Sequence, residues 1–239
     1  MSRGTEGQRD KGTEGVGVAP DHEGKSGLPD RRLLATVRGF MAPDEGARLY
    51  DLALEAGRRG PCLEIGGFCG KSTMYLGSGC RDAGGILYSI DHHRGSEEHQ
   101  PGEEYFDPAL WDPRLGRINS FTEFIRTVEQ GGLTDTVVPI VSASATAARS
   151  WATPLSLVLI DGGHSYAAAF SDYNGWAGHL MPGGFLAIHD IFADPGAGGQ
   201  APRQIYKLAA GSGLFRRLQT TGTLGVLQRR APGETPDGP

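Results

Sequence analysis

The sequence predicts a single α/β domain built on a doubly wound, Rossmann-like sheet. Apolar runs of strand length alternate with helical patterns along most of the chain, as repeated strand–helix units require. Four of these runs end in glycine, aspartate or histidine, at residues 61–66, 86–91, 155–161 and 185–190. Ligands bind outside the carboxyl ends of the strands in such sheets, so these residues predict one functional site at that edge.

The composition excludes several functional classes. A formal net charge of −5 gives no general attraction to nucleic acid or to an anionic membrane. Three cysteines, an odd number without zinc-site spacing, indicate a reducing compartment rather than a disulfide framework. We find neither a long apolar run nor a signal peptide. We therefore expect a soluble, cytoplasmic protein without nucleic-acid or membrane partners.

The two ends of the chain differ from its centre. Residues 1–28 are rich in glycine and charge, which predicts a disordered tail, and residues 231–239 predict a flexible Pro/Gly tail. Residues 29–58 contain two helical patterns, one from Leu33 to Phe40 and one after Pro43, which we interpret as structural. Residues 59–230 then form the α/β domain.

The first strand, residues 61–65, turns sharply into a helix through glycines. Such a turn permits positive φ and close approach of a ligand, and the helix N-terminus supplies free N–H groups. A Walker A loop fits poorly, because Ile65 stands where its first glycine belongs and a loop from Gly66 is one residue short. A dinucleotide fingerprint would need glycine at Phe68.

A third pattern, E-x-G-x-x-x-G, is met by Glu64, Gly66 and Gly70. It is the first motif of class I S-adenosylmethionine (SAM)-dependent methyltransferases, in which the loop lies against the amino-acid part and ribose of the cofactor. The second strand ends in Asp91, about 21 residues later. An acid there accepts hydrogen bonds from ribose hydroxyls, although aspartate also ends strands as a turn former. Because Asp91 occurs together with the glycine turn, we favour ribose binding over turn formation as its role.

Residues 92–117, the lid segment, read as neither helix nor strand. A loop of this length inside a compact domain is usually functional or disordered. Because aromatic residues accompany its charges, we expect a lid that orders over a substrate. Its His92, His93 and His99 lie beside acids, a spacing as typical of a solvated loop as of a metal site.

Residues 119–130 predict an amphipathic helix and residues 137–141 a strand, which Pro139 places near a sheet edge. Ser144 follows this strand. Its hydroxyl is placed either to cap the next helix or to reach an adenine ring.

The second informative stretch is the apolar run of residues 155–160, typical of a strand buried on both faces. It ends in Asp161, with His164 three residues later, and the next strand, residues 185–188, ends in His189 and Asp190. Adjacent strand ends would bring all four side chains to one pocket. Carboxylates and imidazoles suit a divalent metal, whereas helix capping or a buried histidine would explain only one of the four.

Together these blocks resemble the class I SAM-dependent methyltransferases, in particular the metal-dependent sugar O-methyltransferases that act on macrolides and other glycosides. The resemblance covers about residues 35–230 and implies a seven-stranded sheet with a reversed last strand, completed by a hairpin-like pair at residues 215–220 and 223–228. Its most specific parts are the D-G-x-H-S-Y block from Asp161 and the P-G-G…H-D block that ends at Asp190.

The resemblance also implies roles for individual residues. The residues expected to bind SAM are Glu64, Gly66, Gly70, Ser72, Asp91, Ser144 and Asp161. Asp161 and Asp190 would bind Mg²⁺ together with His189, which stands where the family has an acid. His164 would be the general base, with His189 as the alternative.

The implied chemistry is consistent with these residues. A sugar hydroxyl is a poor nucleophile, so a base must take its proton during in-line attack on the sulfonium methyl, and histidine titrates in the right range. We expect a glycoside or oligosaccharide acceptor, with a catechol-type diol and a homo-oligomer left open. Two alternatives are a P-loop-like ATP-dependent phosphotransferase using Lys71 on phosphates, and a non-catalytic SAM-binding protein.

Overall fold

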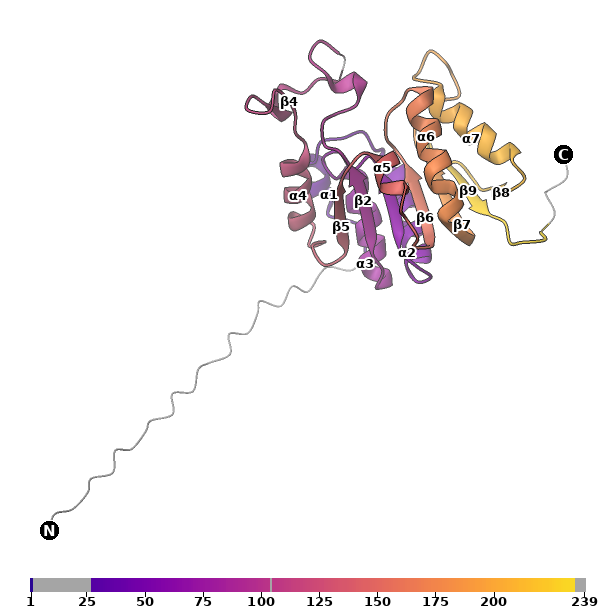
Figure 1. The fold of residues 1–239 in the computed structure, drawn as a ribbon, viewed down its shortest axis with the longest axis horizontal. Coiled ribbons are helices and arrows are strands. Elements are labelled where there is room, and N and C mark those ends of the chain that lie inside the picture. Colours follow the sequence, from indigo (N-terminus) through magenta and orange to yellow (C-terminus); the bar gives the residue numbers. More distant parts are fainter. Residues whose placement is uncertain (2–26, 104, 235–239) are drawn as a thin grey trace.

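A seven-stranded sheet forms the centre of the computed structural model, with strand order β5-β2-β1-β6-β7-β9-β8 (Figure 1). The structure describes Met1, residues 27–103 and residues 105–234. The predicted tails therefore fall largely outside the described residues. The strands of the sheet are β1 (Cys62–Ile65), β2 (Leu87–Asp91), β5 (Val137–Val141), β6 (Leu155–Ile160), β7 (Leu180–Ile188), β8 (Phe215–Arg217) and β9 (Gly225–Arg229).

The direction of the strands confirms the predicted class. β5, β2, β1, β6 and β7 are all parallel, whereas β9, the last strand of the chain, is antiparallel to both of its neighbours. β5 lies at one edge of the sheet, as Pro139 indicated. All six residues of β6 are buried, as its continuous apolar run predicted.

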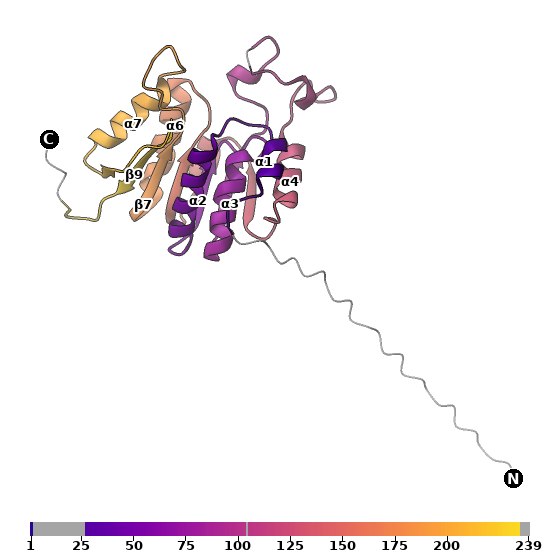
Figure 2. The same ribbon diagram turned by 180° about the vertical axis from the view of Figure 1, so that it is seen from behind.

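Helices cover both faces of the sheet and bury two apolar layers. The helices of one face are α1 (Arg31–Thr36), α2 (Pro43–Gly57), α3 (Lys71–Ala83) and α4 (Phe121–Gln130), and those of the other are α5 (Ser144–Ala148), α6 (Tyr166–Trp176) and α7 (Ala201–Gly211) (Figures 1 and 2). Side chains alternate across the sheet, so Leu159 of β6 packs in the first layer and Val158 in the second.

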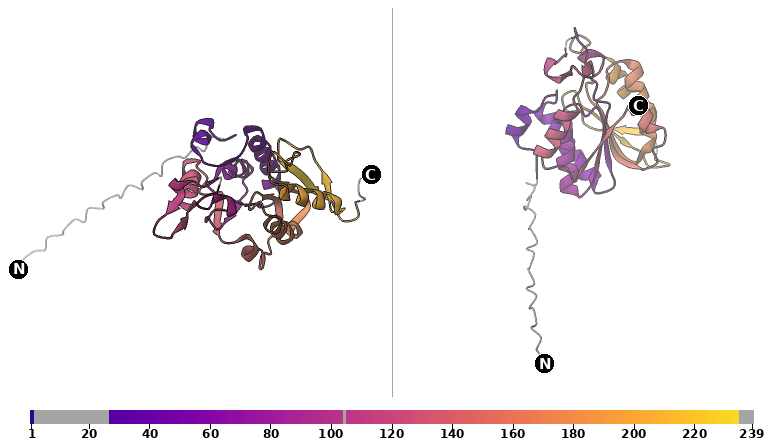
Figure 3. Two further views of the ribbon diagram at one scale, coloured as in Figure 1. Left: turned by 90° about the horizontal axis from the view of Figure 1, so that it is seen from above. Right: turned by 60° about the vertical axis from the view of Figure 1, so that its left-hand side comes forward.

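The lid segment projects beyond the main body at the carboxyl edge of the sheet (Figure 3). It holds two single-turn helices, Glu97–His99 and Pro108–Leu110, and a small hairpin of β3 (Trp111–Asp112) and β4 (Arg117–Ile118). The sequence did not predict these short elements. Leu110 and Ile118 pack on Cys69, next to the glycine turn, and thereby attach the lid segment to the first strand–helix unit.

Two predicted boundaries are wrong. The first helix ends at Thr36 rather than Phe40, because Val37 is already extended, with φ −80° and ψ 126°. Gly39 then takes a φ of +131°, and Phe40 is 68% exposed. The helix before β7 ends at Trp176, apart from a single turn at Ala177–His179. β7 consequently begins at Leu180, and its Pro-Gly-Gly segment is accommodated where the pairing with β6 shifts register.

Cys62, Cys69 and Cys80 are free and buried, so they form no disulfide. Within the described ranges, no helix has both the length and the apolar character needed to cross a membrane.

Leu159→Ala tests the central position of β6. Leu159 is fully buried, so the lost contacts and the remaining cavity should lower the free energy of unfolding by about 2–5 kcal/mol. Val141→Ala is the control, because Val141 lies on the edge strand and is 56% exposed, and its effect should stay within about 0.5 kcal/mol. Urea unfolding of both variants measures the difference, and equal losses would contradict the assigned sheet order.

Candidate active site

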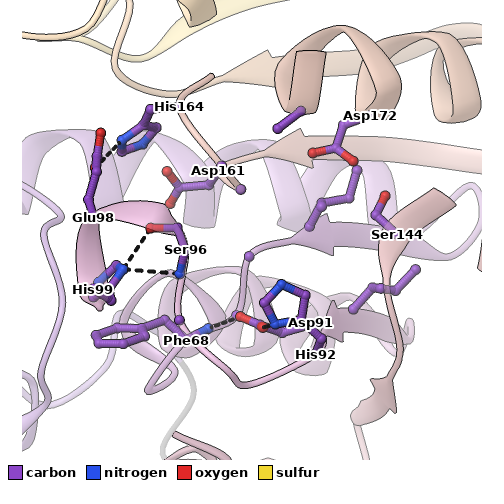
Figure 4. Close-up of a pocket in the computed structure, with 18 of the residues that line it drawn as sticks. Phe68, Asp91, His92, Ser96, Glu98, His99, Ser144, Asp161, His164 and Asp172 are labelled. Carbon is purple, nitrogen blue, oxygen red and sulfur yellow. Dashed lines mark hydrogen bonds and ion pairs between the residues drawn. The ribbon is translucent and has the colours of Figure 1, made fainter. Parts of the chain in front are cut away.

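A cavity of about 450 Å³ opens at the carboxyl edge of the sheet, a size common among small-molecule sites. The loops after β1, β2, β5, β6 and β7 all contribute to its walls. Residues 38–41, between α1 and α2, and residues 95–99 of the lid segment complete them. Figure 4 shows side chains from the loops after β1, β2 and β6, from the lid segment, from the start of α5 and from α6 around one space. The strand ends singled out in the sequence therefore do converge.

The glycine turn lies directly against the end of β6. Gly66 and Gly70 have φ values of +96° and +94°, and a Cβ on Gly66 would lie only 2.0 Å from the carbonyl oxygen of Asp161. A side chain at position 66 would therefore separate β1 from β6. Gly66 and Ser72 line the cavity, whereas Gly70 faces Thr127 of α4.

Glu64 lies beneath this turn and is fully buried, outside the cavity wall. Its carboxyl group accepts hydrogen bonds from the hydroxyls of Ser72, at 3.0 Å, and Thr73. Burial raises the pKa of Glu64 to about 7, although these hydrogen bonds oppose the shift. The sequence predicted that Glu64 and Gly70 bind the cofactor. In the structure neither residue lines the cavity and Glu64 fixes the first turn of α3, so their contact with the cofactor stays a prediction.

Asp91, at the end of β2, lines the cavity and is held by two backbone N–H groups. Phe68 donates to Oδ2 at 2.8 Å and His93 donates to Oδ1 at 2.6 Å. These bonds join the end of β2 to the glycine turn. Each carboxylate oxygen keeps a further lone pair, so Asp91 can still accept hydrogen bonds from a ligand hydroxyl.

The three histidines of the lid segment do not form a cluster. His93 is buried and hydrogen-bonded to Ser120, His99 pairs with Ser96, and the ring of His92 is largely exposed. Among the described residues, none of the three belongs to a group with metal-ligand spacing.

His189, at the end of β7, is buried between two carboxylates. Its Nδ1 lies 3.1 Å from Oδ1 of Asp161 and its Nε2 lies 3.0 Å from Oε2 of Glu45. Burial alone would lower the pKa of His189, but the charge and hydrogen bonds of these acids outweigh it and raise the pKa to about 12. The imidazole is therefore a cation that donates a proton from both nitrogens.

Glu45 reaches this position from the first turn of α2. Its carboxylate also accepts a hydrogen bond from the backbone N–H of Thr223, at 2.6 Å. Burial disfavours its charge, yet the bonds from His189 and Thr223 prevail and lower the pKa of Glu45 to about 2. The sequence indicated only that Glu45 starts a helix, so its role at the site was missed. A lone acid in a helical first turn carries no signal of a distant partner.

His164 follows β6 and also lies between two carboxylates. Its Nε2 is 3.1 Å from Oδ2 of Asp190 and its Nδ1 is 2.9 Å from Oε2 of Glu98 in the lid segment. The bond to Asp190 is the largest influence and, although burial opposes it, the pKa of His164 rises to about 9. The same contacts, with those to His189, hold the pKa of Asp190 far below its usual range. Asp190 has a φ of +58°, which turns its side chain between the two histidines.

The predicted metal ligands Asp161, His189 and Asp190 do converge, with one candidate ligand atom of each within 4.8 Å of the others. A protonated His189 has no lone pair for a metal, because Asp161 and Glu45 occupy both ring nitrogens. The donor set therefore fits a hard cation through the carboxylates of Asp161 and Asp190, with His189 hydrogen-bonded behind them. The sequence predicted three ligands, and the role of His189 as the third stays a prediction.

Ser144 is the first residue of α5 and lines the cavity. It makes no capping bond, since its Oγ instead accepts a hydrogen bond from Nε1 of Trp176 at 2.8 Å. The capping role is thus not observed, and the contact with adenine stays a prediction.

The sequence also did not predict that the segment between α1 and α2 borders the cavity. Arg38 forms ion pairs with Asp107 of the lid segment, at 2.8 Å, and with Glu123 of α4, at 3.7 Å. Lys71 donates a hydrogen bond from Nζ to the carbonyl oxygen of Gly39 at 3.1 Å. Lys71 therefore holds this segment over the cavity. The interrupted helical pattern at Gly39, just before Pro43, was the available signal.

Comparisons with known proteins agree on the fold. A family model described as a methyltransferase domain matches residues 63–191. The cofactor-bound structure of Rv0187 from MTB is 17% identical, with a TM-score of 0.60, and the match covers 84% of this chain and 91% of that one. An O-methyltransferase from Bacillus cereus in complex with SAH is 18% identical, with a TM-score of 0.57 and coverage of 84% and 93%. The O-methyltransferase TomG from Streptomyces achromogenes, in complex with SAM and involved in tomaymycin synthesis, is 17% identical, with a TM-score of 0.55 and coverage of 80% and 82%.

Glu45→Gln tests the buried charge chain. Removing one partner leaves the His189 cation poorly compensated, so the free energy of unfolding at pH 7 should fall by about 3–5 kcal/mol. The folded-state pKa of Glu45 lies below the unfolded value of 4.5, so this stabilisation is present above that pH and disappears as the pH falls toward 2. Urea unfolding from pH 7 to pH 3 measures both effects. Glu55→Gln, an exposed change on the same helix, is the control, and equal behaviour of the two variants would contradict the assignment.

Proposed function

The chain belongs to the class I SAM-dependent methyltransferases, and from this premise we propose that it transfers the methyl group of SAM to a hydroxyl of a sugar or another polyhydroxylated small molecule. The observation that carries the proposal is His164, held in the cavity wall between Glu98 and Asp190. It is a proton acceptor of suitable chemistry beside the strand ends where a ligand binds.

His164 acts as the general base in this proposal. The acceptor hydroxyl attacks the sulfonium methyl in line, the carbon–sulfur bond breaks toward sulfur, and the hydroxyl proton passes to the imidazole. Glu98 accepts a hydrogen bond from Nδ1–H, so the neutral ring carries its lone pair on Nε2, the nitrogen that lies 3.1 Å from Asp190. Binding of a metal by Asp190 would turn that carboxylate away and free Nε2 for the acceptor hydroxyl. With a pKa near 9 the ring is mostly protonated at neutral pH, so the reactive form increases as the pH rises.

The cofactor is bound by the residues that the sequence assigned to it and that line the cavity. Gly66 and Ser72 would take the amino-acid part, because backbone N–H groups at the start of α3 face a carboxylate favourably. Asp91 would accept the ribose hydroxyls. The carboxylates around the cavity suit a ligand that carries positive charge. The cavity volume of about 450 Å³ is that of a small-molecule site.

A divalent metal, with Mg²⁺ as the natural ion for carboxylate ligands, would be held by Asp161 and Asp190. Such an ion would acidify and orient two adjacent hydroxyls of an acceptor. His189 keeps Asp161 oriented through its Nδ1–H, while Glu45 fixes the other side of the ring.

An oxygen acceptor is supported by the solved structures of this fold that are described as O-methyltransferases. The polar lid segment favours a glycoside or oligosaccharide over a flat apolar phenol, and a catechol-type diol is the second candidate. Lys71, which a phosphotransferase would use on phosphates, donates to the carbonyl oxygen of Gly39 instead, and this contact disfavours that alternative. The cytoplasmic location, the lack of nucleic-acid and membrane partners and a homo-oligomeric state stay predictions from the sequence.

The direct test is transfer of a labelled methyl group from SAM to a panel of glycosides and catechols, with Mg²⁺ or with EDTA. We expect a glycoside to be methylated, EDTA to abolish turnover and Mg²⁺ to restore it. His164→Ala should lower kcat on that acceptor by about 10²–10⁴-fold with the affinity for SAM unchanged. Near-normal turnover of this variant would exclude the base role, and turnover in EDTA would exclude the metal.

Glu98→Gln tests the electrostatics of His164. Removing the Glu98 charge lowers the pKa of the imidazole, so the rise of kcat with pH should shift to lower pH in the variant. The measurement is a pH–rate profile from pH 6 to pH 10, compared with that of the exposed control Glu103→Gln. Coincident profiles for the wild type and Glu98→Gln would contradict the proposed pairing.

A further inference from the structure

Asp172 is a cavity residue for which the proposed reaction has no use. It lies on α6, is only 6% exposed and lines the cavity (Figure 4). Within the part of the chain that the structure describes, no basic side chain forms an ion pair with it. A carboxylate withdrawn from water in this way requires hydrogen-bond donors.

Among the described residues, the hydroxyl of Ser144 is the donor to this carboxylate. Trp176 donates its Nε1–H to Oγ of Ser144, so the hydroxyl proton of Ser144 remains available for Asp172. Burial raises the pKa of Asp172 to about 6, although the bond from Ser144 opposes the shift. The group is therefore largely ionised at pH 7.5 and retains acceptor capacity toward the cavity.

Close contact with the backbone fixes the position of this carboxylate. A Cβ on Gly162 would lie 2.9 Å from Oδ2 of Asp172, so the carboxylate packs over the backbone that follows β6. The bond between Trp176 and Ser144 joins α6 to the start of α5. Asp172 therefore lies between the backbone that follows β6 and Ser144 at the start of α5.

The order of the strands indicates which part of SAM lies there. His164 and Asp190 follow β6 and β7, the glycine turn follows β1, Asp91 follows β2 and Ser144 follows β5. In SAM, the ribose lies between the sulfonium and the adenine. If the methyl faces His164 and the ribose lies at Asp91, the adenine extends toward Ser144. The small and apolar side chains that line the cavity in this region are Ile90, Ala143, Ala145 and Ala168.

We propose that Asp172 accepts a hydrogen bond from the exocyclic N6 amino group of the adenine and thereby selects an adenosyl over an inosyl cofactor. This inference rests on the proposed use of SAM. N6 is the one amino group of the base, and the ammonium of SAM belongs to the opposite end of the molecule, with the glycine turn. An inosyl analogue replaces N6 by an oxygen, which would place two acceptors face to face.

The test is calorimetric titration of the full chain at pH 7.5 with SAH and with S-inosyl-L-homocysteine, which differ only at this position of the base. The wild type should bind SAH at least about 100-fold more tightly, because a site built for an N–H donor rejects an analogue without it. Asp172→Asn should reduce this preference at least about 10-fold, because the amide can turn its own N–H toward the inosyl oxygen. Asp172→Ser should reduce it likewise. Asp51→Asn, an exposed change of the same charge on α2, should retain it.

The outcomes separate this inference from the proposed function. Tight binding of SAH with equal affinity for the inosyl analogue would overturn the role of N6 even if no variant folds. A full wild-type preference in folded Asp172→Asn and Asp172→Ser would overturn the role of Asp172. In both cases SAM use would stand. Failure of the wild type to bind SAH would remove the cofactor premise itself, and this inference with it.

Discussion

The site depends on a buried chain of charges from Glu45 through His189 to Asp161. Its three members come from α2, the end of β7 and the end of β6, so one ion-pair network fixes α2 against the two strands whose ends carry the candidate site residues. Such a network contributes little net stability when complete, but it is costly to break. The network therefore serves mainly to orient Asp161 and Asp190 at the cavity.

A second set of contacts joins the cavity to its cover. Glu98 binds His164, and Arg38 binds Asp107, so both connections end in the lid segment. In the proposed reaction the lid segment would therefore influence the base as well as cover the acceptor, because Glu98 contributes to the raised pKa of His164. Movement of the lid segment would change access to the site and the basicity of its histidine together. This coupling is consistent with chemistry that proceeds only in a closed site.

The sequence predicted what depends on local patterns. The buried run before Asp161 and the glycine turn after β1 were recognised, because strand burial and turn chemistry leave periodic and compositional signals. The reversed last strand was predicted from the family resemblance instead. Contacts between distant segments leave no such signal. Glu45 meets His189 across 144 positions, and Glu64 turned out to support the glycine turn from below. The motif therefore located Glu64, whereas the position of its carboxylate beneath the turn became visible only in the structure.

The central claim is that the cavity binds SAM, and calorimetric titration of the purified protein with SAM and, separately, with ATP tests it most directly. The account predicts micromolar binding of SAM and no signal with ATP, with or without Mg²⁺. Binding of ATP without any binding of SAM would contradict it, and would return the glycine turn and Lys71 to a phosphate-binding role.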